Sequence, residues 1–271
     1  MREGSVHALA VVAAVAFVGA VFLVGCPEKP TPAPSSAGGS SAPQPATTPP
    51  PASATPAASA PAGPPGSLQG KILAPKAKRA ELIDTGNVQA DCGQQHDPGS
   101  VLVEDDGSLA GAVVYLKGPK APAGWPDKSK PIEVTNPRCH FEPRISIVPM
   151  GVPVAFTNED TVLHNVAAVA SQNDKFDQSV PGNGRLEHTF ASPEFIPIKC
   201  SVHTFMAGEI VVSEHPWYAL SGAKGAYKLE NVPSGTYKLF VWHETLGKAV
   251  PAGTPVTISP GQATTADVKF E

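Results

Sequence analysis

Apolar residues alternate with other residues in several short stretches of the chain, and each such stretch predicts a β-strand. Between Ile196 and Cys200 the alternation places Ile196, Ile198 and Cys200 on one inward face. Residues 74–108 show no clear periodicity apart from 101–103, so we predict no organisation there. The other expected strands cover 68–73, 109–116, 132–134, 152–158, 225–229, 236–242, 256–258 and 266–270, with one more starting at 210–212. The pattern predicts an all-β fold.

The first 26 residues read as an export signal. Arg2 precedes an apolar run from Ala8 to Val24, which has the length of a signal-peptide core. The sequence from Leu23 to Cys26 then matches a bacterial lipoprotein processing box. We expect cleavage before Cys26 and a lipid anchor on its sulfur, in the cell envelope on the periplasmic side. Pro27 favours the outer membrane, and an uncleaved membrane helix is the alternative.

Residues 27–66 read as a tether. Proline, alanine, serine, threonine and glycine fill this stretch, and it carries a large share of the 31 prolines of the chain. Nothing in it can form a core, so we expect disorder with polyproline II character. Fully extended, the tether would reach on the order of 120 Å at about 3.1 Å per residue. The net charge of −4, spread over 271 residues, predicts no nucleic-acid partner.

The candidate chemistry lies at the end of the strand that leads to Cys200. Cys200, His203 and Met206 follow one another at intervals of three residues, and His164 lies 36 residues before the cysteine. A thiolate, two imidazoles and a thioether are soft ligands that suit copper, with a weak axial methionine. Two other interpretations are a buried free cysteine with no ligand role and half of a zinc site.

Over residues 131–214 the chain resembles the cupredoxins. The similarity rests on Cys-x2-His-x2-Met before an apolar strand, with His164-Asn165 upstream, and the short loop is most similar to that of the amicyanins. The resemblance implies a Greek-key β-sandwich with one type 1 copper, bound by His164, Cys200, His203 and Met206. It also implies that Asn165 ties the two ligand loops together. Thr204 departs from the family pattern, where a proline stiffens the loop.

Residues 67–120 together with 216–271 resemble the carboxypeptidase regulatory-like, or transthyretin-like, β-sandwich. The phrases that carry the similarity are Gly70 to Leu73, Gly111 to Leu116 and Val232-Pro233 with Gly235 and Tyr237. The resemblance implies a discontinuous supporting sandwich, in or beside which the cupredoxin domain lies.

Two cysteines remain after Cys26 and Cys200 are assigned. Cys92 and Cys139 form an even pair in a chain that we expect to be exported, which favours a disulfide. The alternative is a second metal site that uses both cysteines with His96 and His140.

We therefore expect an electron-transfer protein with a weak, transient redox partner. Copper storage and a structural envelope lipoprotein with a vestigial site are the alternatives. No enzyme activity is expected, because Met206 occupies the position that a catalytic copper would leave open. By the same resemblance, His203 should present one ring edge to solvent, with Thr204, Phe205 and Ala207 as an apolar docking rim.

Overall fold

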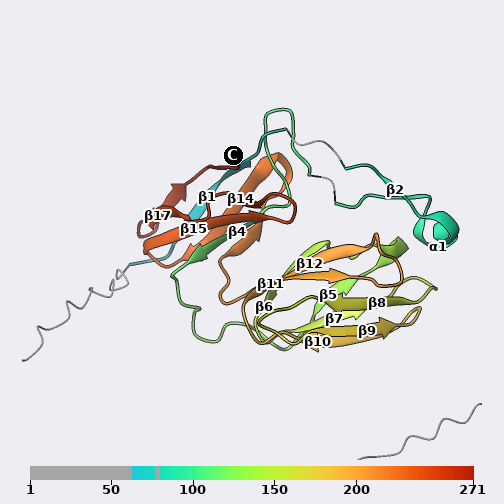
Figure 1. Cartoon of the computed structure of the whole chain (residues 1–271). Coiled ribbons are helices and arrows are strands. Elements are labelled where there is room, and N and C mark those ends of the chain that lie inside the picture. Colours follow the sequence, from blue (N-terminus) through green and yellow to red (C-terminus); the bar gives the residue numbers. More distant parts are fainter. Residues whose placement is uncertain (1–62, 77–79, 100) are drawn as a thin grey trace, which may run out of the picture. The chain divides into compact units, whose positions relative to one another are not determined.

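The computed structural model describes residues 63–76, 80–99 and 101–271 (Figure 1). The expected leader with Cys26, and the tether as far as residue 62, lie outside this part. Among the helices that are described, none is long and apolar enough to cross a membrane.

Strands dominate the described residues, so the fold is all-β as predicted. The expected strand 109–116 begins only at Val113, because Gly111 has a φ of +77° and turns the chain. The expected strand 266–270 is reduced to the two residues Val268–Lys269, and a separate short strand, Ala263–Thr265, precedes it. The strands are β1 (Gly66–Leu73), β2 (Ile83–Asp84), β3 (Gln95–His96), β4 (Val113–Lys117), β5 (Ile132–Thr135), β6 (Ile145–Pro149), β7 (Pro153–Thr157), β8 (His164–Ala168), β9 (Phe176–Val180), β10 (Arg185–Thr189), β11 (Glu194–Lys199), β12 (Ala207–Ser213), β13 (Tyr218–Leu220), β14 (Ala226–Val232), β15 (Gly235–His243), β16 (Gly247–Lys248), β17 (Thr254–Ile258), β18 (Ala263–Thr265) and β19 (Val268–Lys269). The short helices are η1 (Gly86–Val88), α1 (Gln89–Cys92), η2 (Pro137–Cys139) and η3 (Ala223–Gly225).

Strands β5 to β12 form a first sandwich of two sheets, in the orders β10-β7-β5 and β6-β12-β11-β8-β9. Alternate residues of the strands point into the space between the sheets. Phe156 from β7 packs there with Ile196 and Ile198 from β11. The inward phase expected for β11 is confirmed, because Cys200, one residue past its end, is also buried.

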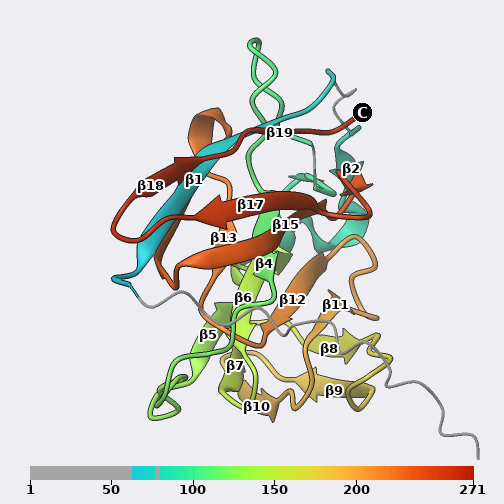
Figure 2. The same cartoon turned by 90° about the vertical axis from the view of Figure 1, so that its left-hand side faces the viewer.

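A second sandwich is formed by sheets in the orders β14-β1-β18, with β19 on β1, and β13-β4-β15-β16, with β17 on β15 (Figure 2). Its core includes Leu68 and Ile72 of β1 facing Leu239 and Val241 of β15. Residues from both ends of the described chain thus build one sandwich, and the first sandwich lies between them in sequence.

Strands β4 and β12 are buried on both faces, which explains why their sequences run apolar without alternation. In β4, Val114 points into the core of the second sandwich, whereas Val113 and Tyr115 point out of it. In β12, Val211 points out of the first sandwich. These outward residues share one cluster with Ile145, so the two sandwiches pack through β4 and β12.

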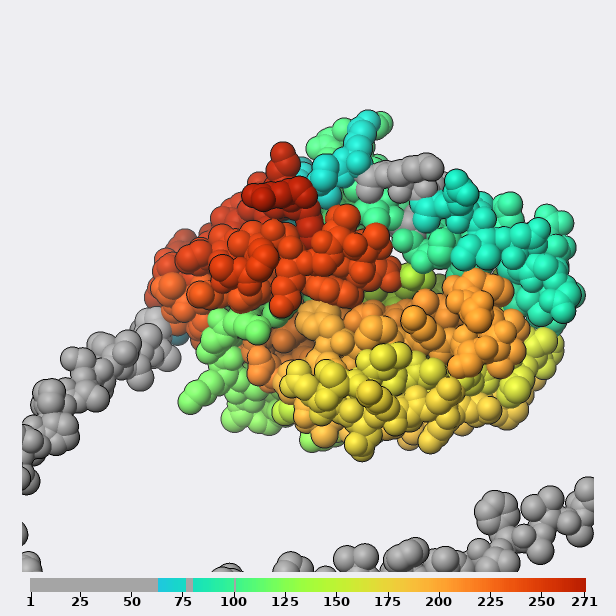
Figure 3. Space-filling model, viewed as in Figure 1, coloured from blue at the N-terminus to red at the C-terminus, as the bar shows by residue number. Residues whose placement is uncertain are grey.

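The segment from Gly86 to His96, which we call the cap, joins neither sandwich sheet. It contains η1, α1 and β3, and its Cys92 packs with the core of the first sandwich. In Figure 3 the cap, coloured teal, lies against the orange atoms of residues near 200. The stretch without periodicity therefore covers the region where the candidate ligands lie.

Candidate metal centre

Two loops of the first sandwich carry the candidate ligands. His164 is the first residue of β8, and Cys200 directly follows β11. His203 and Met206 lie on the tight loop from β11 to β12. Two backbone hydrogen bonds close this loop, from the amide of Cys200 to the carbonyl of Met206 at 3.1 Å and from the amide of Met206 to the carbonyl of His203 at 2.9 Å.

Three donor atoms from these loops face one another. The Sγ atom of Cys200 lies 3.9 Å from Nδ1 of His164 and 3.9 Å from Nδ1 of His203. The two Nδ1 atoms are 3.0 Å apart. The point equidistant from the three atoms lies about 2.1 Å from each, close to metal–nitrogen and metal–sulfur bond lengths. The side chains present therefore fit a metal ion bound in a plane of two nitrogens and one sulfur.

All four candidate ligands are shielded from water. His164 and Met206 are fully buried, Cys200 is 1% exposed and His203 is 6% exposed. Met206 belongs to the same core cluster as Cys200, which keeps its thioether in apolar surroundings.

Electrostatics make the thiol of Cys200 more acidic, and the ring of His164 more basic, than they are in water. Burial tends to raise the pKa of Cys200, but hydrogen bonds from His164 and from backbone amides outweigh burial and lower that pKa. Burial tends to lower the pKa of His164, and its hydrogen bonds to Cys200 and Asp160 reverse this effect and raise the pKa. Burial and the neighbouring charge of His164 lower the pKa of His203. The thiol proton is thus easily released, as a soft metal requires.

Asn165 connects the two ligand loops, as the resemblance implied. Its Oδ1 accepts a hydrogen bond from the backbone amide of Ser201, and its Nδ2 donates to Oγ of Ser201 at 3.1 Å. The same Nδ2 also donates to Asp177 on β9. The residue after the cysteine ligand is therefore fixed to the residue after the first histidine.

The cap buries His203, so the expected solvent-exposed ring edge is wrong. The sulfur atoms of Cys92 and Cys139 lie within 4.8 Å of a ring nitrogen of His203. Phe205 of the expected docking rim packs on His96 of the cap, with ring centroids 4.8 Å apart. Within that rim Thr204 is exposed, while Phe205 and Ala207 are half-buried.

Cys92 and Cys139 form a disulfide that joins the cap to the first sandwich. The alternative second metal site with His96 and His140 loses both of its sulfur ligands to this bond. The two histidine rings stack instead, with centroids 4.1 Å apart. The disulfide expected from counting cysteines is therefore the arrangement that the fold contains.

Sequence reasoning missed two acidic residues around the site. Asp160 binds Nε2 of His164 at 2.9 Å, and Asp91 of the cap accepts a hydrogen bond from Oγ1 of Thr161 at 3.0 Å. A carboxylate four residues before a candidate ligand was the available signal for Asp160. Asp91 had no such signal, because its partner lies 70 residues away.

Comparison with known proteins gives limited matches. No protein-family model and no curated protein sequence matches the chain. A purple cupredoxin from Nitrosopumilus maritimus is 23% identical, with a TM-score of 0.28. The match covers 30% of this chain and 99% of the cupredoxin chain. The Cu(I) form of an amicyanin mutant is 23% identical, with a TM-score of 0.29. The match covers 37% of this chain and 98% of the amicyanin chain.

A copper-containing nitrite reductase from Thermus scotoductus SA-01 is 26% identical. That match covers 36% of this chain and 25% of the reductase, with a TM-score of 0.31. All three solved structures match only about a third of this chain. We therefore base the assignment of a metal on the donor geometry.

Proposed function

We propose that this protein binds one copper ion and carries single electrons in the cell envelope. The observation that supports this most is the triangle of one sulfur and two nitrogen atoms with sides of 3.9, 3.9 and 3.0 Å. His164, Cys200 and His203 would hold the metal, with Met206 as the weak fourth ligand. Bound copper would supply a one-electron couple between Cu(I) and Cu(II).

The chain holds its ligands in place before any metal arrives. The backbone amide of His203 lies 3.4 Å from Sγ of Cys200, and Asn165 fixes the neighbouring Ser201. A site held in this way changes little between oxidation states, which favours electron transfer over storage. We propose no enzyme activity, because Met206 as a fourth ligand would occupy the position that a catalytic copper leaves open.

A redox partner would approach beside the cap. Leu163 and Val202 each precede a histidine ligand, and they are 46% and 51% exposed. They offer a small apolar surface of the kind that weak redox encounters use. Val202→Asp should slow electron exchange with a partner while the visible absorption of the copper-loaded site persists. Val169→Asp is the matched control, because Val169 is 55% exposed and lies at the opposite end of β8 from His164.

The central test is the visible spectrum of the copper-loaded protein. A thiolate bound to Cu(II) should give intense visible absorption, and Cys200→Ser should remove it completely. Reversible reduction and reoxidation of the coloured form would favour electron transfer. A coloured form that cannot be cycled would instead favour copper storage, and no colour with copper in excess would contradict both functions.

Membrane anchoring remains part of the proposal through Cys26. Cys26→Ser should abolish acylation and leave an uncleaved precursor, which labelling with a radioactive fatty acid and the change in mass would detect. A variant that is still processed, and still partitions with membranes, would contradict the anchor.

A further inference from the structure

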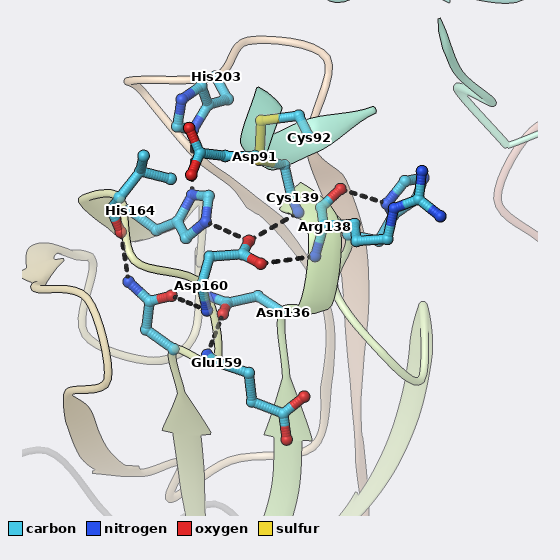
Figure 4. A network of polar contacts seen from close by, with 12 residues as sticks. Asp91, Cys92, Asn136, Arg138, Cys139, Glu159, Asp160, His164 and His203 are labelled. Atoms are coloured by element: carbon cyan, nitrogen blue, oxygen red, sulfur yellow. Dashed lines mark hydrogen bonds and ion pairs between the residues drawn. A yellow bond between two sulfur atoms is a disulfide. The ribbon is translucent and has the colours of Figure 1, made fainter. Parts of the chain in front are cut away.

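We propose that Asp160 is the positioning residue of the metal centre and shifts its preference towards the higher oxidation state. This inference rests on the proposed function. Asp160 lies in the turn between β7 and β8, and its side chain is only 10% exposed. Its carboxylate faces Nε2 of His164 (Figure 4). The other ring nitrogen, Nδ1, is the one near Cys200.

Backbone amides hold the Asp160 carboxylate in place. Oδ1 accepts a hydrogen bond from the amide of Arg138 at 2.7 Å, and Oδ2 accepts one from the amide of Cys139 at 2.8 Å. Arg138 and Cys139 have φ angles of +52° and +61°, an unusual backbone conformation for residues with side chains. Two successive amides then point the same way and form an anion-binding concavity.

The surroundings of this turn keep the carboxylate aimed at His164. The Asp160 amide donates to Oδ1 of Asn158 at 3.0 Å, and the Glu159 amide donates to Oδ1 of Asn136 at 3.1 Å. Cys139 is in turn joined to the cap by its disulfide. Asp160 is therefore held by its own turn and by residues 136–139, which the disulfide joins to the cap.

The contact decides which nitrogen of His164 is free for a metal. A carboxylate that receives amide hydrogen bonds acts as an acceptor, so the proton of the His164 ring belongs on Nε2. The lone pair then lies on Nδ1, the atom that faces Cys200 and His203. A carboxylate in this position fixes the ring and makes the facing nitrogen a better donor.

Charge gives the contact a second consequence. The negative carboxylate, acting through the His164 ring, stabilises a doubly charged metal more than a singly charged one. Removal of this charge should therefore weaken binding of Cu(II) more than binding of Cu(I). If Asp160 only supported the fold, its removal would weaken the binding of Cu(II) and the binding of Cu(I) equally.

Asp160→Asn tests the inference, with Glu159→Gln as the matched control. Glu159 is the exposed neighbour of Asp160, and the substitution also removes one negative charge. In Asp160→Asn the amide group places a donor against either His164 or the two backbone amides. We expect Cu(II) affinity, measured by chelator competition, to fall about 10- to 100-fold while Cu(I) affinity falls less. The reduction potential should then rise by about 59 mV for each tenfold difference between the two losses.

Asp160→Glu is a conservative variant that separates the effect of the charge from a general effect on folding. It keeps the charge near His164, although the longer side chain fits the concavity less well. Its potential should lie closer to that of the wild type than the potential of Asp160→Asn does. Equal potentials in Asp160→Asn, Glu159→Gln and the wild type would overturn the inference, as would equal losses of Cu(II) and Cu(I) affinity.

An arm without copper separates this inference from the proposed function. Nitrogen-15 NMR of metal-free protein should find the His164 proton on Nε2 in the wild type and a mixture of both ring forms in Asp160→Asn. If the wild type never takes up copper, the proposed function fails, while the NMR arm still reports on Asp160. If the wild type is blue and its ring form does not respond to Asp160→Asn, only the inference fails.

Discussion

The two sandwiches of this protein bury similar apolar cores but use their buried polar side chains differently. In the second sandwich, Ser221 and His215 bind the backbone. Ser221 donates to the carbonyl of Leu109 at 2.8 Å, and its hydroxyl accepts from the amide of Ala112 at 2.9 Å. His215, on the segment that enters this sandwich, contacts the carbonyl of Leu116 through Nε2 at 3.0 Å. Each such group completes a turn or a strand end.

In the first sandwich, the buried side chains of the candidate site contact one another, although other buried groups, such as Asn158, bind backbone carbonyls. His164 faces Cys200 and His203 on one side and Asp160 on the other. Groups of this kind are costly to bury without a partner, and here their partners are other ionisable groups. The difference teaches that a buried histidine alone indicates nothing, whereas a buried histidine that faces a thiol and a second imidazole indicates a site.

The largest effect should follow from cutting the link between the cap and the first sandwich. The disulfide closes a separation of 47 residues, so Cys92→Ala with Cys139→Ala should lower the free energy of unfolding by about 4 kcal/mol. Denaturant unfolding measures this change. His203 should also become accessible to solvent, which broadening of its NMR signals by a soluble paramagnetic probe would detect. Unchanged protection of His203 would show that the cap is held without the disulfide.

A second effect concerns Glu209, which lies near the contact of the two sandwiches. Burial and the nearby Glu244 raise its pKa to about 8, although Arg144 opposes this shift. The folded state then holds a proton that the unfolded state releases between about pH 4.5 and 8, so stability should fall as pH rises through that window. Glu209→Gln should flatten this fall by about 3 kcal/mol once screening by solvent is allowed for. A variant with the same pH slope as the wild type would refute this prediction.

Glu194 should give the opposite pH dependence within the first sandwich. Burial tends to raise its pKa, but hydrogen bonds from Ser171, Asn173 and Gln172 lower it to about 2. Its stabilising contribution is therefore complete above about pH 4.5 and is lost as pH falls towards 2. Glu194→Gln should cost about 2 kcal/mol at neutral pH once screening by solvent is allowed for. Thermal unfolding of the wild type and the variant between pH 2 and 7 would measure the stability cost and its pH dependence. If the two proteins lost stability in parallel as the pH falls, Glu194 would not have this role.

Ser221→Ala should have the smallest effect and isolates the second sandwich. The substitution leaves the amide of Ala112 and the carbonyl of Leu109 without their buried partner, at a cost of about 1–2 kcal/mol. The copper spectrum and the reduction potential should remain unchanged, because the hydroxyl binds only backbone groups of its own sandwich. A shift in either would mean that the second sandwich acts on the metal centre.

Alternation along the chain predicted some of the strands whose two faces have different surroundings, but it missed others, such as β10. Strand β11 alternates between buried and exposed residues, and its inward phase was read correctly through Cys200. Strand β4 was misplaced at its start, because both of its faces are buried and its apolar residues do not alternate. An apolar run cannot show where a strand begins when nothing along it faces water.

The sequence by itself also determined the ligand loop. Cys200, His203 and Met206 lie so close in sequence that a tight loop must keep them together. Only the tertiary structure decided what surrounds them. Asp160 receives the amides of residues 21 and 22 positions away, and the cap reaches His203 from more than 100 positions earlier. Contacts over such separations depend on how strands pair and pack, so no local pattern could have announced that His203 is covered or that two distant amides hold the Asp160 carboxylate.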